Sequence, residues 1–216
     1  MSDQRLRELE RRWRETGSVE DEAAYLRERV RVGDLTQERL ELAAYCGHEG
    51  ATRATEVPRM ELSALLEMVH ESGELPTLIC AASIMKQLVP LDQDLEPLSV
   101  GLRRLVEQST NGEACDYKHL FSLCTKAQEA RGATSISPDD MSDRDRSFIA
   151  GTLLAHELCC EYGGLLPLAN PGKHVLQILF DHLLPGLPTG FQIEHYARAA
   201  VANWSICSSH DQKSGV

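Results

Sequence analysis

The stretch "RLRELERRWRETG", Arg5–Gly17, decides the fold class of this chain. Leu6, Leu9 and Trp13 recur at spacings of three and four residues, so they line one side of a helix and leave the charged residues on the other side. Gly17 follows, and glycine is the residue that most often ends a helix. The stretch therefore predicts a short amphipathic helix that packs through its apolar side.

The same pattern continues through the next two segments. "VEDEAAYLRERVRVG" (19–33) places Ala23, Leu26 and Val30 on one face, and "QERLELAAYCG" (37–47) follows after a short connection. Short helices joined by tight turns favour antiparallel neighbours.

Polar residues mark where helices begin. Ser18, with Asp21 three positions later, resembles a capping box, and Thr36 is placed to cap the helix that follows it. The acid-rich stretches "DQDLE" (92–96) and "DDMSDRD" (139–145) are typical of first helical turns, where the helix dipole favours negative charge. We interpret both stretches as helix starts and not as catalytic acid clusters.

Helical periodicity extends over most of the remaining chain. The segments are 58–74, 75–90, 94–110, 115–132, 144–164, 172–186 and 191–209. Pro58 is expected in the first turn of its helix, and 75–90 is apolar on nearly all sides and is expected to be buried. No segment alternates apolar and polar residues between hairpin turns. The sequence predicts an all-α protein of about ten short antiparallel helices, and because no fixed repeat appears, an irregular helical bundle and a divergent α-solenoid both stay open.

Composition suggests where the chain divides. The small, polar and acidic stretch "GATSISPDDMSD" (132–143) is the expected linker. It separates a central helical region, 56–131, from a C-terminal helical region, 144–207, and an N-terminal helical segment covers 1–55. We expect these regions to form one continuous globular unit.

The charge of the chain limits its partners. It has 22 basic and 33 acidic side chains, a net charge of −11. Nucleic-acid binding depends on a basic surface, so we expect no nucleic-acid partner. No apolar run approaches the roughly 18 residues of a spanning helix, and no apolar stretch at the N-terminus resembles a signal peptide. We therefore expect a cytoplasmic protein without membrane contact, whose seven cysteines stay reduced and pack as small apolar residues.

The residues "CGHE", Cys46–Glu49, combine a thiol, an imidazole and a carboxylate. We interpret them as the punctuation between two helices, with Gly47 ending one helix and His48 beginning the next turn. A cysteine at a helix C-terminus lies near the negative end of the dipole, which raises the pKa of its thiol and disfavours the reactive thiolate.

The stretch "AHELCCEYGG" (155–164) is the sharpest chemical candidate. His156 and Cys160 are four residues apart and share a helix face with Glu157 beside them, so these three are the candidate catalytic residues, and His156 and Cys160 are the candidate metal ligands. A zincin helix needs a second histidine where Cys160 stands, and a structural zinc site needs four ligands. We therefore favour a packed helix with no cofactor.

Other motifs add little to an enzymatic interpretation. His174 and His195 could complete a site with His156 only from distant positions in the chain. The sequence has no glycine-rich phosphate loop and no nucleophile elbow. The sequence motifs therefore favour a protein that is not an enzyme, and they leave the question open.

The segment from Leu6 to Ala51, "LRELERRWRETG…ELAAYCGHEGA", resembles an N-terminal helical segment of uncharacterised myxobacterial proteins. In several of these proteins it precedes an alanine-rich helical region of the immunity-protein type. After about Thr55 this sequence departs from that pattern, because the alanine-rich helices are absent. The resemblance implies a bacterial source and helical character, and it brings no catalytic residue.

Three functional hypotheses follow. The favoured one is an acidic, all-helical protein-binding module, of the immunity or adaptor type, with a basic protein as its partner. The second is a small-molecule-binding protein or enzyme with a pocket between helices near His156, Glu157 and Cys160. The third is an oligomeric structural subunit that uses the apolar helix 75–89 as an interface, and the sequence leaves the oligomeric state open.

Overall fold

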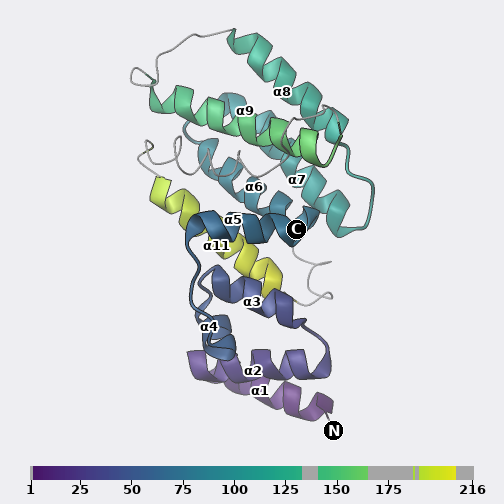
Figure 1. Ribbon diagram of the computed structural model, residues 1–216, viewed down its shortest axis with the longest axis vertical. Coiled ribbons are helices and arrows are strands. Elements are labelled where there is room, and N and C mark those ends of the chain that lie inside the picture. Colours follow the sequence, from purple (N-terminus) through teal and green to yellow (C-terminus); the bar gives the residue numbers. More distant parts are fainter. Residues whose placement is uncertain (1, 133–140, 165–186, 188–189, 208–216) are drawn as a thin grey trace. The chain divides into compact units, whose positions relative to one another are not determined.

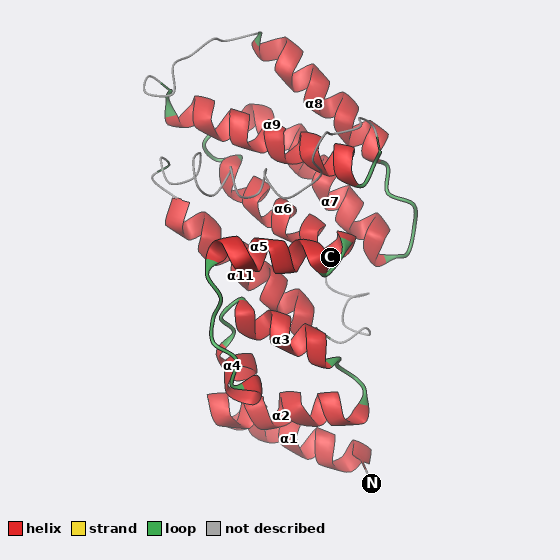
Figure 2. Ribbon diagram, in the orientation of Figure 1, coloured by secondary structure: helices red, strands yellow, loops and turns green. Residues whose placement is uncertain are grey.

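The computed structural model describes residues 2–132, 141–164, 187 and 190–207, and within these ranges it contains helices and loops but no β-strand (Figure 1, Figure 2). The described helices are α1 (Ser2–Thr16), α2 (Val19–Val32), α3 (Gln37–Tyr45), α4 (Glu49–Thr55), α5 (Leu62–Glu71), α6 (Glu74–Leu88), α7 (Glu96–Thr110), α8 (Tyr117–Arg131), α9 (Asp143–Glu161) and α11 (Gly190–Ile206), with a 3-10 turn, η1, at Gln93–Leu95. The prediction of an all-α fold of about ten short, packed helices is confirmed. The helix expected at 172–186 lies outside the described residues.

The contacts divide the chain into two units where one continuous unit is expected. Unit 1 comprises Met1–Val69 and Arg198–Val216, and unit 2 comprises His70–Ala197. The expected C-terminal region, 144–207, is therefore shared between the units, because the last part of α11 packs with the N-terminal helices. The expected linker, 132–143, lies for most of its length outside the described residues and stays a prediction. None of the described helices has both the length and the apolar character that crossing a bilayer requires.

Unit 1 begins its helices at the expected capping residues. The Ser18 hydroxyl accepts a hydrogen bond from the Asp21 N–H (3.1 Å), and the Thr36 hydroxyl accepts one from the Arg39 N–H (3.3 Å). The Ser18 cap is not a full capping box, because the Asp21 carboxylate turns away to pair with Arg12 at 2.7 Å.

The first two helices of unit 1 pack through the predicted apolar faces. The rings of Trp13 and Tyr25 stack with centroids 5.4 Å apart, and Ala23 and Leu26 are buried. Gly33 ends α2 with φ 82°, a left-handed conformation that glycine adopts without steric strain.

Two arginines hold the end of α11 within unit 1. Arg39 donates to the carbonyl oxygens of Trp204 (2.6 Å) and Cys207 (2.9 Å), and Arg29 donates to the carbonyl of Ile206. The last carbonyls of a helix have no partner within it, so the guanidinium groups satisfy them and complement the negative end of the helix dipole.

A third arginine fixes the stretch between α4 and α5. Arg198 is only 6% exposed and donates to the carbonyls of Tyr45 (3.4 Å) and Met60 (3.1 Å), while the Met60 N–H donates to the Tyr45 carbonyl (3.1 Å). These bonds keep the stretch non-helical. The expectation that Pro58 lies in a first helical turn is therefore wrong, because long-range hydrogen bonds hold the chain there and α5 begins four residues later, at Leu62.

In unit 2, α6 packs against α7 and α9, and α8 packs against the same two helices. The buried residues of α6 are Pro76, Thr77, Leu78, Cys80, Ala81, Ile84, Met85 and Leu88. The expected burial of this apolar helix is confirmed. Helices of the same unit cover the surface that suggested an oligomer interface.

An ion-pair network joins η1 to the end of α8 and the start of α9. The fully buried side chain of Asp92 pairs with Arg131 and, at 3.4 Å, with Arg144. Arg131 also pairs with Asp145 at 2.7 Å, and its guanidinium group lies 4.3 Å from the centre of the Phe148 ring. Every member of the network has more than one partner, which offsets the cost of burying its charge.

The acid-rich stretches begin helical turns as expected. Asp92 caps η1 by accepting the Asp94 N–H (3.1 Å), and Ser142 with Asp145 forms a full capping box at the start of α9. The beginning of the second stretch, 139–140, lies outside the described residues.

We predict that Asp92→Ala lowers the free energy of unfolding by about 3 kcal/mol, because it leaves the Arg131 guanidinium without its buried partner. Asp94→Ala is the matched control, since Asp94 is 56% exposed and pairs with Arg144 at the surface (3.0 Å). Its effect should stay below about 1 kcal/mol. Urea denaturation followed by circular dichroism measures both. Equal losses in the two variants would contradict the structural role of Asp92.

Candidate functional site

The predicted site on α9 is only partly assembled. The Cys160 Sγ lies 3.6 Å from the His156 Nδ1, and the His156 ring packs against the Phe121 ring with centroids 5.7 Å apart. Cys160 is 6% exposed, and burial, followed by the neighbouring Glu157 carboxylate, raises the pKa of its thiol. A buried neutral thiol is a poor nucleophile and a poor metal ligand.

The structure shows no further ligand beside this pair in the part of the chain that it describes. Among the described residues, no group of three or more His, Cys, Asp or Glu side chains is placed to hold a metal ion. His195 lies edge-on to Tyr196, with ring centroids 5.7 Å apart, and His174 lies outside the described residues. Of the candidate residues, the structure brings His156 together only with its neighbours on α9.

The structure adds a contact that the sequence does not predict. The His70 Nε2 lies 2.9 Å from the Glu161 Oε1, and the Tyr162 hydroxyl lies 3.4 Å from the His70 Nδ1 and donates to Thr77 at 3.2 Å. Both ring nitrogens of His70 are therefore engaged. We interpret the group as a structural tie that holds the end of α9 to His70 and to the start of α6, because its hydrogen bonds run between these residues.

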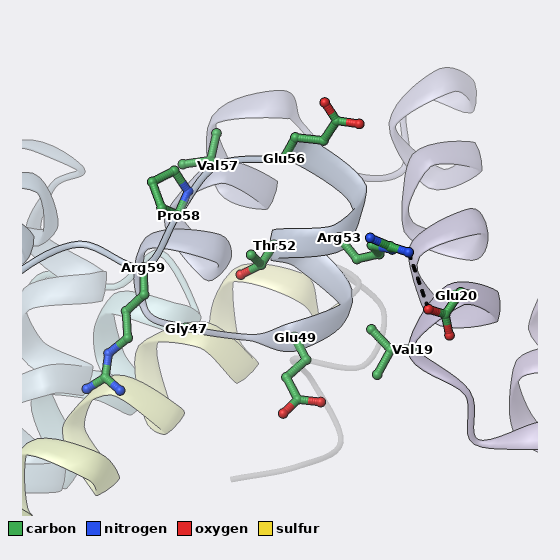
Figure 3. Close-up of a pocket in the computed structure, with 10 residues that line it drawn as sticks. All are labelled: Val19, Glu20, Gly47, Glu49, Thr52, Arg53, Glu56, Val57, Pro58 and Arg59. Carbon is green, nitrogen blue, oxygen red and sulfur yellow. Dashed lines mark ion pairs between the residues drawn. The ribbon is translucent and has the colours of Figure 1, made fainter.

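A groove in unit 1 offers a different kind of site. It has a volume of about 870 Å³ and runs along α4, between the start of α2 and the stretch that follows α4 (Figure 3). The interpretation of "CGHE" as punctuation is confirmed at its edge, where Cys46 caps the end of α3, Gly47 has φ 90° and His48 caps the start of α4.

The Cys46 thiol does not serve the groove. Burial raises the pKa of Cys46 to about 12, and the charge of Arg198 offsets only part of this rise. The pKa of Cys46 is raised, as predicted, but the main cause is burial and not the expected position at a helix end. The next residue, Gly47, is exposed. The Arg59 side chain lies next to it, and the Arg59 Cδ would be 3.2 Å from a Cβ at position 47.

The chain forms the groove because α4 ends in a sharp reversal. Glu56 has φ 62°, the one left-handed non-glycine residue in the described part of the chain, and it turns the backbone so that Val57 and Pro58 return beside α4. In Figure 3 these two residues lie on one side of α4, and Arg53 and Glu20 lie on the other. A left-handed residue other than glycine costs roughly 1 kcal/mol, so the surrounding bonds must hold it.

The charges of the groove are unevenly paired. Arg53 pairs with Glu20 at 3.6 Å. Glu49 and Glu56 stand at the two ends of α4, both exposed, and neither makes an ion pair in the part of the chain that the structure describes. Glu56 follows Glu49 by seven positions, which places the Cα atoms of the two residues about 10 Å apart along the axis of α4. Val19, Val57 and Pro58 add apolar surface.

Described residues of unit 2 line two smaller grooves, of about 640 and 510 Å³, on two sides of α8. Both include residues beside the Asp92–Arg131 network, whose charges already satisfy one another. The groove along α4 is the better candidate site, since it is larger and leaves two carboxylates open.

From the sequence, Glu49 stands out only within the "CGHE" connection and Pro58 only as an expected helix start, and Glu56 and Val57 carry no signal. A proline two residues after the C-cap of a short helix is the signal that was available, because proline often follows a helix end. No protein-family model matches the chain, and no curated protein and no solved structure matches it. The site therefore rests on its geometry.

We predict that Cys207 reacts first with a thiol-specific disulfide reagent near pH 8. Cys207 is exposed, whereas burial raises the pKa of Cys124 to about 11 and that of Cys159 to about 12. A thiol with a pKa of 12 is ionised in only about one molecule in ten thousand near pH 8. Cys207→Ser should remove the fast phase, and the buried thiols should react only after unfolding. A fast reaction at Cys160 would revive the catalytic interpretation of α9.

We predict that Glu157→Gln stabilises the protein at neutral pH. Burial raises the pKa of Glu157 above its ordinary value of 4.5, partly offset by His156. The proton is therefore bound more tightly in the folded state, so the charged carboxylate costs stability as the pH rises through the raised pKa. The gain in the free energy of unfolding should shrink as the pH falls toward 4.5. Urea denaturation of both proteins at neutral pH and near pH 4.5 measures it. Glu129→Gln, at an exposed position on α8, is the control and should change little.

Proposed function

We propose that this protein is a protein-binding module that takes a basic segment of a partner into the groove along α4. The observation that carries the proposal is the pair of exposed carboxylates, Glu49 and Glu56, at the two ends of the groove without ion-pair partners in the described structure. Apolar surface from Val57 and Pro58 lies beside them. A segment with cationic side chains on either side of an apolar residue matches this arrangement.

The charge of the whole chain supports a basic partner. A net charge of −11 raises the local concentration of cationic molecules and speeds their association, an effect that weakens as salt screens the charges. In this proposal the chain's field brings the partner close, and the groove decides which segment is held.

The resemblance of Leu6–Ala51 to a segment of uncharacterised myxobacterial proteins, some of them of the immunity type, suggests one specific form of the proposal. Val19, Glu20, Gly47 and Glu49, which line the groove, belong to that segment, and a toxin with a basic surface would be the partner. An adaptor that binds a basic peptide is the other form. Both require the same contact with α4.

An enzymatic role for α9 has weaker support. Burial raises the pKa of Cys160 and of Glu157, and the His156–Cys160 pair has no third ligand among the described residues. The neutral thiol favours packing over nucleophilic attack.

We predict that the protein binds a fluorescent peptide of Arg-Leu-Gly repeats and not the same peptide with glutamate in place of arginine. Glu49→Lys with Glu56→Lys should weaken binding at least about tenfold, since each surface pair contributes up to about 1 kcal/mol and reversal turns attraction into repulsion. Fluorescence anisotropy at low salt measures the affinity. Binding should also weaken as salt is added.

The matched control is Glu107→Lys with Glu113→Lys, which makes the same change in net charge at exposed positions of unit 2. This variant should lose much less affinity than the groove variant. Equal losses in the two variants would mean that the peptide responds to net charge alone, and the groove would then not be the site.

A further inference from the structure

The start of α4 depends on a histidine in one protonation state. The His48 Nδ1 accepts a hydrogen bond from the Ala51 N–H at 3.2 Å, which makes His48 the N-cap of α4. A ring nitrogen accepts only when it carries no proton, so this cap requires the neutral imidazole with its proton on Nε2. The Nε2 then lies 3.8 Å from the Glu22 Oε1.

The ring and its partner are both largely shielded from solvent. The side chain of His48 is 19% exposed and that of Glu22 is 16% exposed. The Glu22 carboxylate reaches the first turn of α4 because Gly50 has no side chain, and a Cβ there would lie 2.3 Å from the Glu22 Oε2. The carboxylate of α2 therefore lies close to both the capping ring and the helix that it caps.

Charged groups reach this region from each element around it. Glu22 comes from α2, Glu49 follows His48 in α4, and Arg59 comes from the stretch after α4 and lies over Gly47. On α3, the charge of Arg39 is directed to carbonyls at the end of α11. Of these charged groups, the Glu22 carboxylate lies within ion-pair distance of the His48 ring, 3.8 Å from its Nε2.

We propose that His48 is a pH-sensitive cap that keeps α4 and its groove formed when the ring is neutral and releases the first turn of α4 when the ring is protonated. Protonation turns Nδ1 from an acceptor into a donor, so it faces the Ala51 N–H as a second donor. It also places positive charge at the positive end of the helix dipole. Glu22 holds the charged ring against α2 but cannot replace the lost acceptor. This inference rests on the proposed function for its effect on binding.

The helix is short enough to respond to this change. It has seven residues, and helices of this length have little stability of their own. Loss of a side-chain N-cap typically changes the balance between a formed and a frayed first turn about fivefold. Glu49 and Thr52 lie in that turn and line the groove, so fraying displaces part of the binding surface.

Nuclear magnetic resonance of the full chain tests the cap without any ligand. Long-range nitrogen–proton correlation should find the His48 proton on Nε2 near pH 8, and the Ala51 amide should exchange with solvent about fivefold faster near pH 5.5, relative to its intrinsic rate. His48→Asn keeps an amide oxygen as the cap and does not titrate, so its Ala51 amide should stay equally protected at both pH values. A proton on Nδ1 near pH 8, or the same pH response in His48→Asn, would overturn the proposal.

The Arg-Leu-Gly peptide then separates the switch from the proposed function. In the wild type its affinity should fall about fivefold between the two pH values, and in His48→Asn it should change much less. If the amide response appears but the peptide binds at neither pH, the cap is upheld and the proposed function fails. If the peptide binds and its affinity falls equally in both proteins, the groove is upheld and the His48 switch fails.

Discussion

The groove along α4 depends on where one guanidinium group finds its acceptors. Arg198 is buried, and a buried arginine is tolerated only when its donors are satisfied. Two of its acceptors are the carbonyl of Tyr45, at the end of α3, and the carbonyl of Met60, in the stretch after α4. By bonding to both, Arg198 fixes that stretch beside the end of α3. One wall of the groove is thus fixed by a residue far away in the sequence. The same hydrogen bonds help to offset the cost of the left-handed conformation of Glu56.

The polar groups of the molecule fall into two kinds. Around Asp92, and around His70, every charged or hydrogen-bonding group has partners from the same unit, so these networks fix helices in place and present little to a ligand. Along α4 the opposite holds, because Glu49 and Glu56 remain exposed at the ends of a short helix. Groups that satisfy one another stabilise the fold, whereas groups left open at a groove are available to a partner. This difference favours the groove as the candidate site more clearly than residue type does, since thiols, imidazoles and carboxylates occur in both kinds of region.

Local features of the structure could be read from the sequence, and long-range ones could not. Helix periodicity and the caps at Ser18 and Thr36 depend on neighbours within four positions, so they were predictable, as was the buried α6. Pro58 was placed wrongly because its conformation is set by hydrogen bonds from Arg198. The groove was missed for the same reason, since its residues carry no motif and meet only when the chain reverses after α4. The predicted residues on α9 were correct as a helix face, but burial of the thiol, which no spacing reveals, changes what they can do.

The division of the chain between the two units also bears on how it is made. A ribosome delivers residues 1–69 first, then all of unit 2, and only afterwards the part of α11 that carries Arg198. While unit 2 emerges, the Tyr45 and Met60 carbonyls therefore lack the Arg198 donor that bonds to them in the complete chain. Under the proposed function, a nascent chain could hold a partner in the finished groove only after the part of α11 that carries Arg198 has been synthesised.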